Sequence, residues 1–255
     1  VSQFGWRYIM NAAGFLILAL SLVILIFMKN PGSENSANNF KRGIWDNLIL
    51  VIFIPQIWII AVTGGGMAAI ITAFVGLWGV PFLMEAKQIL KPMAAALISF
   101  VLLGSAIGAP LAGWVADHIR RCKPVILIGT SLMLFNLSLI IFIDLTVSVG
   151  FYILLFFLGL TLGCVIVIYT VARQHSPSGA EGTTISFVNM IAMSSGGLFQ
   201  PLIGWLLDLK WNGELLSGYR IYTIEGYREA FIPLVVISLC AIIFGALIDE
   251  RRPEH

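Results

Sequence analysis

Seven long apolar stretches constrain the fold of this chain more than any other feature of its sequence. Each is close to the 20 or so apolar residues that a helix needs to cross the hydrocarbon core of a bilayer. The stretches are Arg7–Met28, Ile57–Leu83, Met93–Val115, Pro124–Leu145, Val149–Ala172, Thr183–Leu207 and Glu229–Ile248. Only 11% of the residues are charged, whereas a soluble domain carries roughly 25%. The sequence therefore predicts an all-α membrane protein with seven transmembrane helices, whose surface is covered by the lipid bilayer.

An eight-residue phrase occurs twice in the chain. Pro110-Leu-Ala-Gly-Trp-Val-Ala-Asp117 ends near the close of the third stretch, and Pro201-Leu-Ile-Gly-Trp-Leu-Leu-Asp208 ends near the close of the sixth. These stretches are the middle members of two groups of three, and they cross the membrane in opposite directions. The last six spans are therefore predicted to form two inverted three-helix repeats, an arrangement typical of transporters.

The polar segments divide the chain into four parts. We expect a transmembrane helix over residues 1–28, a cytoplasmic linker over 29–56, a six-helix bundle over 57–248 and a cytoplasmic tail over 249–255. Within the linker, Phe40–Ile54 mixes basic and apolar residues, which favours an amphipathic helix on the membrane surface. The alternative is that this segment extends the second span, although Pro55 favours a break. We also expect the Gly64-Gly65-Gly66 run to bend or loosen the second span.

Basic residues set the orientation of the spans. One set of connections holds nine: Lys29, Lys41, Arg42, Arg120, Arg121, Lys123, Arg173, Arg251 and Arg252. The opposite set holds six: Arg7, Lys87, Lys91, Lys210, Arg220 and Arg228. The first set, and with it the C-terminus, is predicted to lie in the cytoplasm. The first residue then lies outside, which is an expected feature of a piece of a longer protein.

Two motifs resemble the major facilitator superfamily. Gly5-Trp6-Arg7 resembles the start of that family's sixth helix, and the segment from Gly113 to Lys123 resembles its cytoplasmic signature, Gly-x-x-x-Asp-Arg/Lys-x-Gly-Arg-Arg/Lys. His118 and Arg120 depart from the pattern, where Arg or Lys and Gly are usual. The resemblance implies the C-terminal half of a transporter plus the last helix of its missing N-terminal half. It also implies a secondary transporter that moves a small solute by alternating access, in a bacterial inner membrane.

The signature implies a conformational latch at the cytoplasmic ends of the helices. Asp117 could accept hydrogen bonds from the N-terminus of the sixth span, or pair with Arg121 or Arg173. The alternative is that the arginines only anchor the topology and that Asp117 is a solvated charge.

Small residues and prolines suggest helices that pack closely and move. Gly104, Gly108 and Gly113 recur in the third span, and Gly197 and Gly204 in the sixth, which favours close helix contacts. Pro110 and Pro201 remove a backbone hydrogen bond and are expected to kink their helices.

No acidic or basic residue lies deep in a span, so a solute would meet uncharged groups in this part of the protein. The candidates for the substrate path are Gln56, Trp78, Tyr169, Asn189, Met193 and Gln200. Asn189 and Gln200 are the strongest, because a buried amide needs hydrogen-bond partners. Ordinary helix packing is the alternative for each of them.

Other functions find less support in the sequence. Enzymatic activity is not expected, because no acidic pair and no HExxH motif lies in a span. The three histidines and three cysteines lack metal-ligand spacing, so neither a metal nor another cofactor is expected. A net charge of +2 does not indicate nucleic-acid binding. A seven-span receptor or another non-transport membrane protein remains the alternative, against which the inverted repeat argues.

Overall fold

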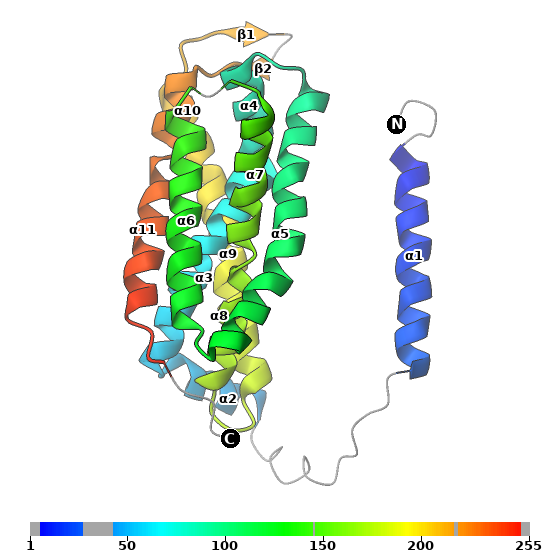
Figure 1. Ribbon diagram of the computed structural model, residues 1–255, viewed down its shortest axis with the longest axis vertical. Helices are drawn as coiled ribbons and strands as arrows, with labels where there is room; N and C mark the ends of the chain where they lie inside the picture. The colour runs from blue at the N-terminus through cyan, green and yellow to red at the C-terminus, as the bar shows by residue number, and fades with distance from the viewer. Residues whose placement is uncertain (1–5, 28–42, 145, 217–218, 251–255) are drawn as a thin grey trace. The chain divides into compact units, whose positions relative to one another are not determined.

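The computed structural model describes residues 6–27, 43–144, 146–216 and 219–250 (Figure 1). Within these ranges, seven helical segments are long and apolar enough to cross a membrane. They are Met10–Phe27, Pro55–Lys87, Lys91–Ile119, Lys123–Phe142, Val149–Gln174, Glu181–Leu209 and Ile224–Ala246. The predicted all-α membrane fold is therefore confirmed, apart from one pair of two-residue strands. The segment around Lys41 and Arg42 lies outside the described residues.

The chain forms two compact units, Val1–Arg42 and Gly43–His255. The first contains one long, mostly apolar helix, α1 (Trp6–Phe27), in which Ser21 Oγ donates a hydrogen bond to the carbonyl of Ile17. The second unit is the helical bundle that carries the candidate site.

The bundle contains six spans, of which three are continuous helices in the part that the structure describes. The elements are α2 (Ile44–Ile52), α3 (Pro55–Ala69), η1 (Ile70–Trp78), α4 (Gly79–Lys87), α5 (Lys91–Ile119), α6 (Lys123–Phe142), α7 (Val149–Leu162), α8 (Val165–Gln174), α9 (Glu181–Leu209), β1 (Leu215–Leu216), β2 (Tyr219–Arg220), α10 (Ile224–Ala230) and α11 (Ile232–Ala246). Span two comprises α3, η1 and α4, and spans three and four are α5 and α6. Span five comprises α7 and α8, span six is α9, and span seven comprises α10 and α11.

The contacts between helices follow the symmetry of an inverted repeat. Helix α5 packs most extensively against α7 of the other triplet, and its counterpart α9 packs in the same way against α3. Helix α11 lies against α3, as its counterpart α6 lies against α7, and α6 and α11 contact each other. Each contact therefore has its mirror once spans two, three and four are exchanged for five, six and seven. This mirrored packing agrees with the two three-helix repeats predicted from the repeated phrase.

The first member of each triplet is interrupted. In span two, α3 passes into η1, a nine-residue π-helix, before α4 begins. In span five, α7 ends at Leu162 and α8 begins at Val165, with Gly163 and Cys164 between them. Interrupted spans at equivalent positions of two repeats are a feature of many transporter folds.

The prediction that the Gly64-Gly65-Gly66 run bends or loosens the helix of span two is wrong, because the irregular backbone lies further along the span. All three glycines lie in the regular helix α3 and are buried. A Cβ atom at Gly66 would come within 2.8 Å of the carbonyl oxygen of Ile237 on α11, and one at Gly64 within 3.0 Å of the side chain of Ile168 on α8. These glycines let the neighbouring helices approach closely, and the irregular backbone begins only at Ile70.

Helices α5 and α7 cross at two glycine pairs. A Cβ atom at Gly104 would overlap the carbonyl oxygen of Phe156, and one at Gly108 would overlap that of Leu160. The partners are Gly159 on α7 and Gly163 directly after its end, where a Cβ atom would overlap backbone atoms of Val101 and of Gly108 and Ala109, respectively. Both spans carry the Gly-x-x-x-Gly spacing that permits such contacts.

The linker contains a short helix that is separate from span two. Helix α2 has nine residues, and α3 begins anew at Pro55. Val51 of α2 is buried, whereas Trp45 on the same helix and Phe53 directly after it remain exposed. The indole Nε1 of Trp58 donates to the carbonyl of Ile52 at 2.8 Å and thereby fixes the junction. The position of α2 on a membrane surface stays a prediction.

An aromatic cluster joins the α4 end of span two to span seven. The ring of Phe82 lies 5.3 Å from that of Phe231 and 5.8 Å from that of Tyr227, and Phe74 lies 5.4 Å from Phe231. Phe74 belongs to η1 and Phe82 to α4, while Tyr227 and Phe231 lie at the α10–α11 junction. Edge-to-face aromatic pairs of this kind each contribute about 0.5–1.5 kcal/mol beyond the area they bury.

Candidate functional site

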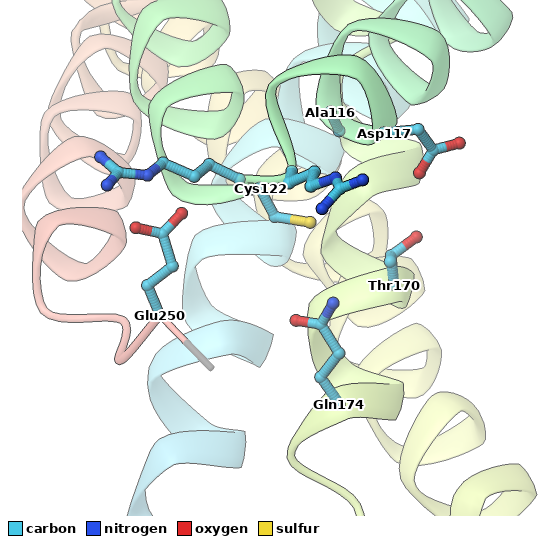
Figure 2. A pocket seen from close by; sticks show the side chains of 8 residues that line it. Ala116, Asp117, Cys122, Thr170, Gln174 and Glu250 are labelled. Carbon is cyan, nitrogen blue, oxygen red and sulfur yellow. The ribbon is translucent and has the colours of Figure 1, made fainter. Parts of the chain in front are cut away.

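A small cavity lies at the end of the bundle where α5 turns into α6. Its volume is about 130 Å³, and it is lined by Ala116, Asp117, Arg120, Arg121, Cys122, Thr170, Gln174 and Glu250. Figure 2 shows the Cys122 thiol between Glu250 on one side and Asp117 on the other, with Thr170 and Gln174 reaching in from α8. The cavity therefore joins the signature segment to span five and to the residues that follow α11.

The turn after α5 forms despite the arginine at its glycine position. The backbone of Arg120 is left-handed, with φ 53° and ψ 32°. Its amide bonds the carbonyl of Asp117 at 3.2 Å, and the amide of Arg121 bonds the carbonyl of Ala116 at 3.1 Å. These two bonds are the Schellman pattern that ends many helices. A non-glycine residue pays roughly 1–2 kcal/mol for this conformation.

The predicted latch contacts are not made in this conformation. Three ion pairs with N···O distances within 4.0 Å occur in the described part of the chain, and none contains Asp117, Arg121 or Arg173. Asp117 and Arg121 line the same cavity, whereas Arg173 is exposed on α8 and does not line it. The N-terminal region of α9 bonds elsewhere, because Thr184 Oγ1 lies 2.8 Å from Ser176 Oγ.

The Cys122 thiol is held in its neutral form. Burial raises its pKa, and the nearby carboxylates of Asp117 and Glu250 raise it further, while a hydrogen bond with Gln174 acts in the opposite direction. Sequence analysis missed Thr170, Gln174 and Glu250 as members of this cavity. They come from segments distant in sequence, and the three-dimensional packing of α5 against α8 brings two of them to the signature.

Tyr169 and Asn189 meet between spans five and six. The Tyr169 hydroxyl donates to Asn189 Oδ1 at 2.9 Å. In the part of the chain that the structure describes, the Asn189 amide nitrogen has no hydrogen-bond partner, so its two N–H groups can bind a ligand. Met193, one turn further along α9, is 54% exposed. These three candidates from the sequence therefore form one open surface with free donors and a flexible apolar side chain.

The side chains of Gln200 and Trp78 donate hydrogen bonds to backbone carbonyls across the interface between α9 and span two. The Gln200 amide nitrogen donates to the carbonyl of Thr72 at 2.9 Å, and the Trp78 indole nitrogen donates to the carbonyl of Gln200 at 3.0 Å. Gln200 contacts span two and Asn189 contacts span five, so α9 turns this face toward both interrupted spans. The Trp78 N–H and one N–H of the Gln200 amide are used in these bonds, whereas within the described residues neither N–H of Asn189 is used.

Gln56 lies at the beginning of span two, away from the other candidates. Its amide nitrogen donates to Asp249 Oδ2 at 2.9 Å, and the backbone amide of Asp249 donates to Gln56 Oε1 at 3.4 Å. The side chain therefore ties the start of α3 to the residues that follow α11.

The glycines predicted to mediate helix packing differ in how closely other helices approach them. Gly104 and Gly108 lie at the α5–α7 crossing, and a Cβ atom at Gly204 would lie 3.1 Å from the Trp78 ring. Gly113 and Gly197 have no other heavy atoms within 4 Å of an added Cβ atom. Pro110 and Pro201 lie inside α5 and α9, both of which remain continuous helices.

Ion pairs at the other end of the bundle were missed by sequence analysis. Arg220 pairs with Asp208 at 2.6 Å, and the Tyr222 hydroxyl donates to the same carboxylate at 2.6 Å. Partial burial and the neighbouring Asp208 carboxylate raise the pKa of Tyr222. Arg228 pairs with Asp144 at 2.6 Å and links span seven to span four. The available signal was the aspartate that ends the second copy of the repeated phrase.

The two inverted triplets, whose first spans are interrupted helices, are a fold typical of membrane transporters. The sequence profile of the Major Facilitator Superfamily matches residues 1–201 and 80–255, which together cover the whole chain. The chain therefore belongs to the major facilitator superfamily. No curated protein matches it in a sequence search.

The chain is also similar to a solved structure, that of a bacterial homolog of the human lysosomal transporter Spinster, in an inward-facing and occupied conformation. The TM-score is 0.54 at 15% sequence identity, which is a likeness of fold. The match covers 96% of this chain and 57% of that one, so the chain spans little more than half the length of this solved relative.

Proposed function

We propose that this chain is part of a secondary active transporter that moves a small solute across a membrane by alternating access. It corresponds in this proposal to the C-terminal half, preceded by the last helix of an N-terminal half. The observation that carries the proposal is the mirrored packing of two triplets whose first spans are interrupted. Such spans place irregular backbone and unpaired polar groups near a central binding site, where a rocking motion can expose them to either side.

The solute is proposed to meet Asn189, Tyr169 and Met193. Asn189 offers two N–H donors, and the Tyr169 hydroxyl oxygen can accept a hydrogen bond while it donates to Asn189. Met193 adds an adaptable apolar contact. These groups are uncharged, so this half of the path suits a solute that presents a carbonyl or hydroxyl oxygen to it. Any charge that couples transport to an ion gradient would then come from the other half.

The cytoplasmic cavity is proposed to change during the transport cycle. Asp117 and Arg121 already line it together. In another conformation of the protein, a modest movement of α5 relative to α8 and α9 would allow Asp117 to reach Arg121, Arg173 or the start of α9. The latch would then stabilise that conformation relative to this one, in which these pairs are open.

The proposed orientation places this cavity and the C-terminus in the cytoplasm of a bacterium, with the bundle in the inner membrane. Arg120, Arg121, Lys123 and Arg173 lie at this end of the spans, and such clusters favour the cytoplasmic side. A green fluorescent protein fused to the C-terminus should fluoresce, since this protein folds in the cytoplasm. A fusion that is present in the membrane but does not fluoresce would show that the orientation is the opposite one.

The test is uptake by the complete protein in proteoliposomes. The vesicles are incubated with a mixture of neutral and charged small metabolites, with and without a proton or sodium gradient, and their contents are measured by mass spectrometry. At least one solute should accumulate above empty vesicles when a gradient is applied. Failure of every solute to accumulate, with the protein folded and inserted, would favour a receptor or another non-transport protein.

The residue assignment is tested with the solute so identified. Asn189→Ala and Tyr169→Phe should raise the Michaelis constant by roughly three- to tenfold, as expected for a lost hydrogen bond of about 1 kcal/mol. Ser131→Ala is the control, because Ser131 is exposed on the peripheral helix α6. If both substitutions leave the Michaelis constant and maximal rate unchanged at normal expression, these residues do not bind the solute.

A further inference from the structure

Two side-chain hydrogen bonds connect η1 to α9, and both end on backbone carbonyls. Gln200 Nε2 donates to the carbonyl of Thr72 at 2.9 Å, while Trp78 Nε1 donates to the carbonyl of Gln200 at 3.0 Å. The donors come from opposite helices, so the bonds run in opposite directions across the interface. Because each bond ends on the backbone, together they fix the position of one helix relative to the other at two points.

Glycines on α9 bring η1 close enough for these bonds. A Cβ atom at Gly196 would lie 3.0 Å from the Thr72 side chain, and one at Gly204 would lie 3.1 Å from the Trp78 ring. Gly196, Gln200 and Gly204 are spaced by four residues, so they form one stripe along the helix. Thr72 sits on the stripe at one end and Trp78 at the other, with Gln200 between them.

The segment held by this stripe is the π-helix of span two. Its hydrogen bonds reach back five residues, as in the bond from the amide of Gly79 to the carbonyl of Phe74. A π-helix is intrinsically rare and is retained mainly where its surroundings favour it. A return to α-helical spacing would change the register of α4 relative to α3 and rotate α4 about the helix axis. Phe82 of α4 would then leave the aromatic cluster with Tyr227 and Phe231.

Both ends of span two pack against span seven. On the α3 side, Gly66 contacts α11, Gly64 contacts α8, and α3 also packs extensively against α9. On the α4 side, Phe82 packs against the α10–α11 junction. The π-helix lies between these attachments and is the irregular part of the span, where the orientation of α4 relative to α3 is set. The side-chain hydrogen bonds that hold it to α9 are those of Gln200 and Trp78.

We propose that Gln200 and Trp78 are positioning residues that lock the π-helical joint of span two to α9, so that the joint and α9 move together as one unit. The proposal assigns Gln200 no contact with solute. It rests on the proposed function only for the movement, since the locked joint itself can be measured without any substrate.

The lock is tested by hydrogen–deuterium exchange of the full chain in detergent micelles. Gln200→Leu replaces the amide donor with an apolar side chain of similar size. Trp78→Phe removes the indole N–H while keeping a ring against Gly204. In either variant the amides of residues 70–87 should exchange about three- to tenfold faster, because one hydrogen bond that closes the joint is lost. Exchange in residues 55–69 should remain within twofold of wild type.

Asn189→Leu is the matched control, since it removes an amide from the same helix. Its bond runs to Tyr169, so it should leave exchange of residues 70–87 unchanged. Unchanged exchange of this segment in Gln200→Leu and Trp78→Phe would overturn the proposal. An equal rise in residues 55–69 would also overturn it, because that result describes general destabilisation. If Gln200→Leu fails to fold, Trp78→Phe decides the matter alone.

Transport measurements distinguish failure of the proposed lock from failure of the proposed transport function. If the complete protein transports a solute, Gln200→Leu should lower the maximal rate at least threefold and leave the Michaelis constant within twofold of wild type. A raised Michaelis constant with an unchanged maximal rate would make Gln200 a solute ligand and overturn the proposal. If wild-type protein transports nothing but the local exchange result holds, the locked joint stands and the transporter assignment fails.

Discussion

The crossing of α5 and α7 gives a direct prediction about stability. A methyl group at Gly104 would overlap the carbonyl oxygen of Phe156, which belongs to the backbone of α7 and cannot rotate away. Gly113 lies nine positions further along the same helix and has no other heavy atoms within 4 Å of an added Cβ atom. Alanine substitutions at the two positions therefore differ in one respect, which is whether the new methyl group meets another helix.

The magnitude follows from two opposing contributions. Alanine in place of glycine in a helix interior is favourable by roughly 0.5–1 kcal/mol, and this contribution is common to both variants. Overpacking a close contact costs typically about 1–3 kcal/mol, and only Gly104→Ala incurs it. Gly113→Ala should be slightly more stable than wild type, and Gly104→Ala should be less stable than Gly113→Ala by about 1–3 kcal/mol.

The assay is equilibrium unfolding of the chain in mixed micelles, followed by circular dichroism as the fraction of denaturing detergent rises. Gly159→Ala should behave like Gly104→Ala, because its methyl group would overlap the backbone of Val101. Gly197→Ala should behave like Gly113→Ala, since no neighbour lies within 4 Å. Equal midpoints for Gly104→Ala and Gly113→Ala would refute a backbone contact at this crossing.

Two further predictions concern the turn between α5 and α6. Because Arg120 is left-handed, Arg120→Gly should be more stable than Arg120→Ala by about 1 kcal/mol, although both lose the same side chain; equal unfolding midpoints in mixed micelles would contradict the left-handed turn. In a chain whose Cys164 and Cys240 are replaced by serine, Asp117→Asn should accelerate maleimide labelling of Cys122 near pH 8, because a carboxylate that raises the thiol pKa is removed and more thiolate forms. Labelling that is equally fast with and without the carboxylate would place Asp117 too far away to act on the thiol.

The spans and their division into two triplets could be predicted from the sequence because hydropathy is a strong constraint in a membrane chain. The hydrocarbon core requires a helix of about 20 apolar residues, so the stretches from Ile57 onward had few alternatives. The repeated phrase ending at Asp117 and Asp208 then related the two triplets. Both signals are local or nearly so, and neither depends on the details of side-chain packing.

Individual contacts were harder to predict, because they depend on the register between distant helices. The sequence identified Gln200 and Trp78 as notable, yet it could not reveal that their donors bond carbonyls on opposite helices. It placed Gln56 in a path, whereas Asp249 holds its side chain at the start of α3. The Gly159–Gly163 spacing in span five was readable in the sequence and was missed, although the same spacing at Gly104 and Gly108 was noticed.

The two copies of the repeated phrase show where the triplets differ. Both end in a carboxylate at the close of a middle helix, and only Asp208 has ion-pair and hydroxyl partners in the described part of the chain. The cause lies in the connections: the segment after α9 is long enough to fold back and bring Arg220 and Tyr222 to Asp208, whereas the tight Schellman turn after α5 directs the chain straight into α6. Helix packing is therefore duplicated while the chemistry at the helix ends is not.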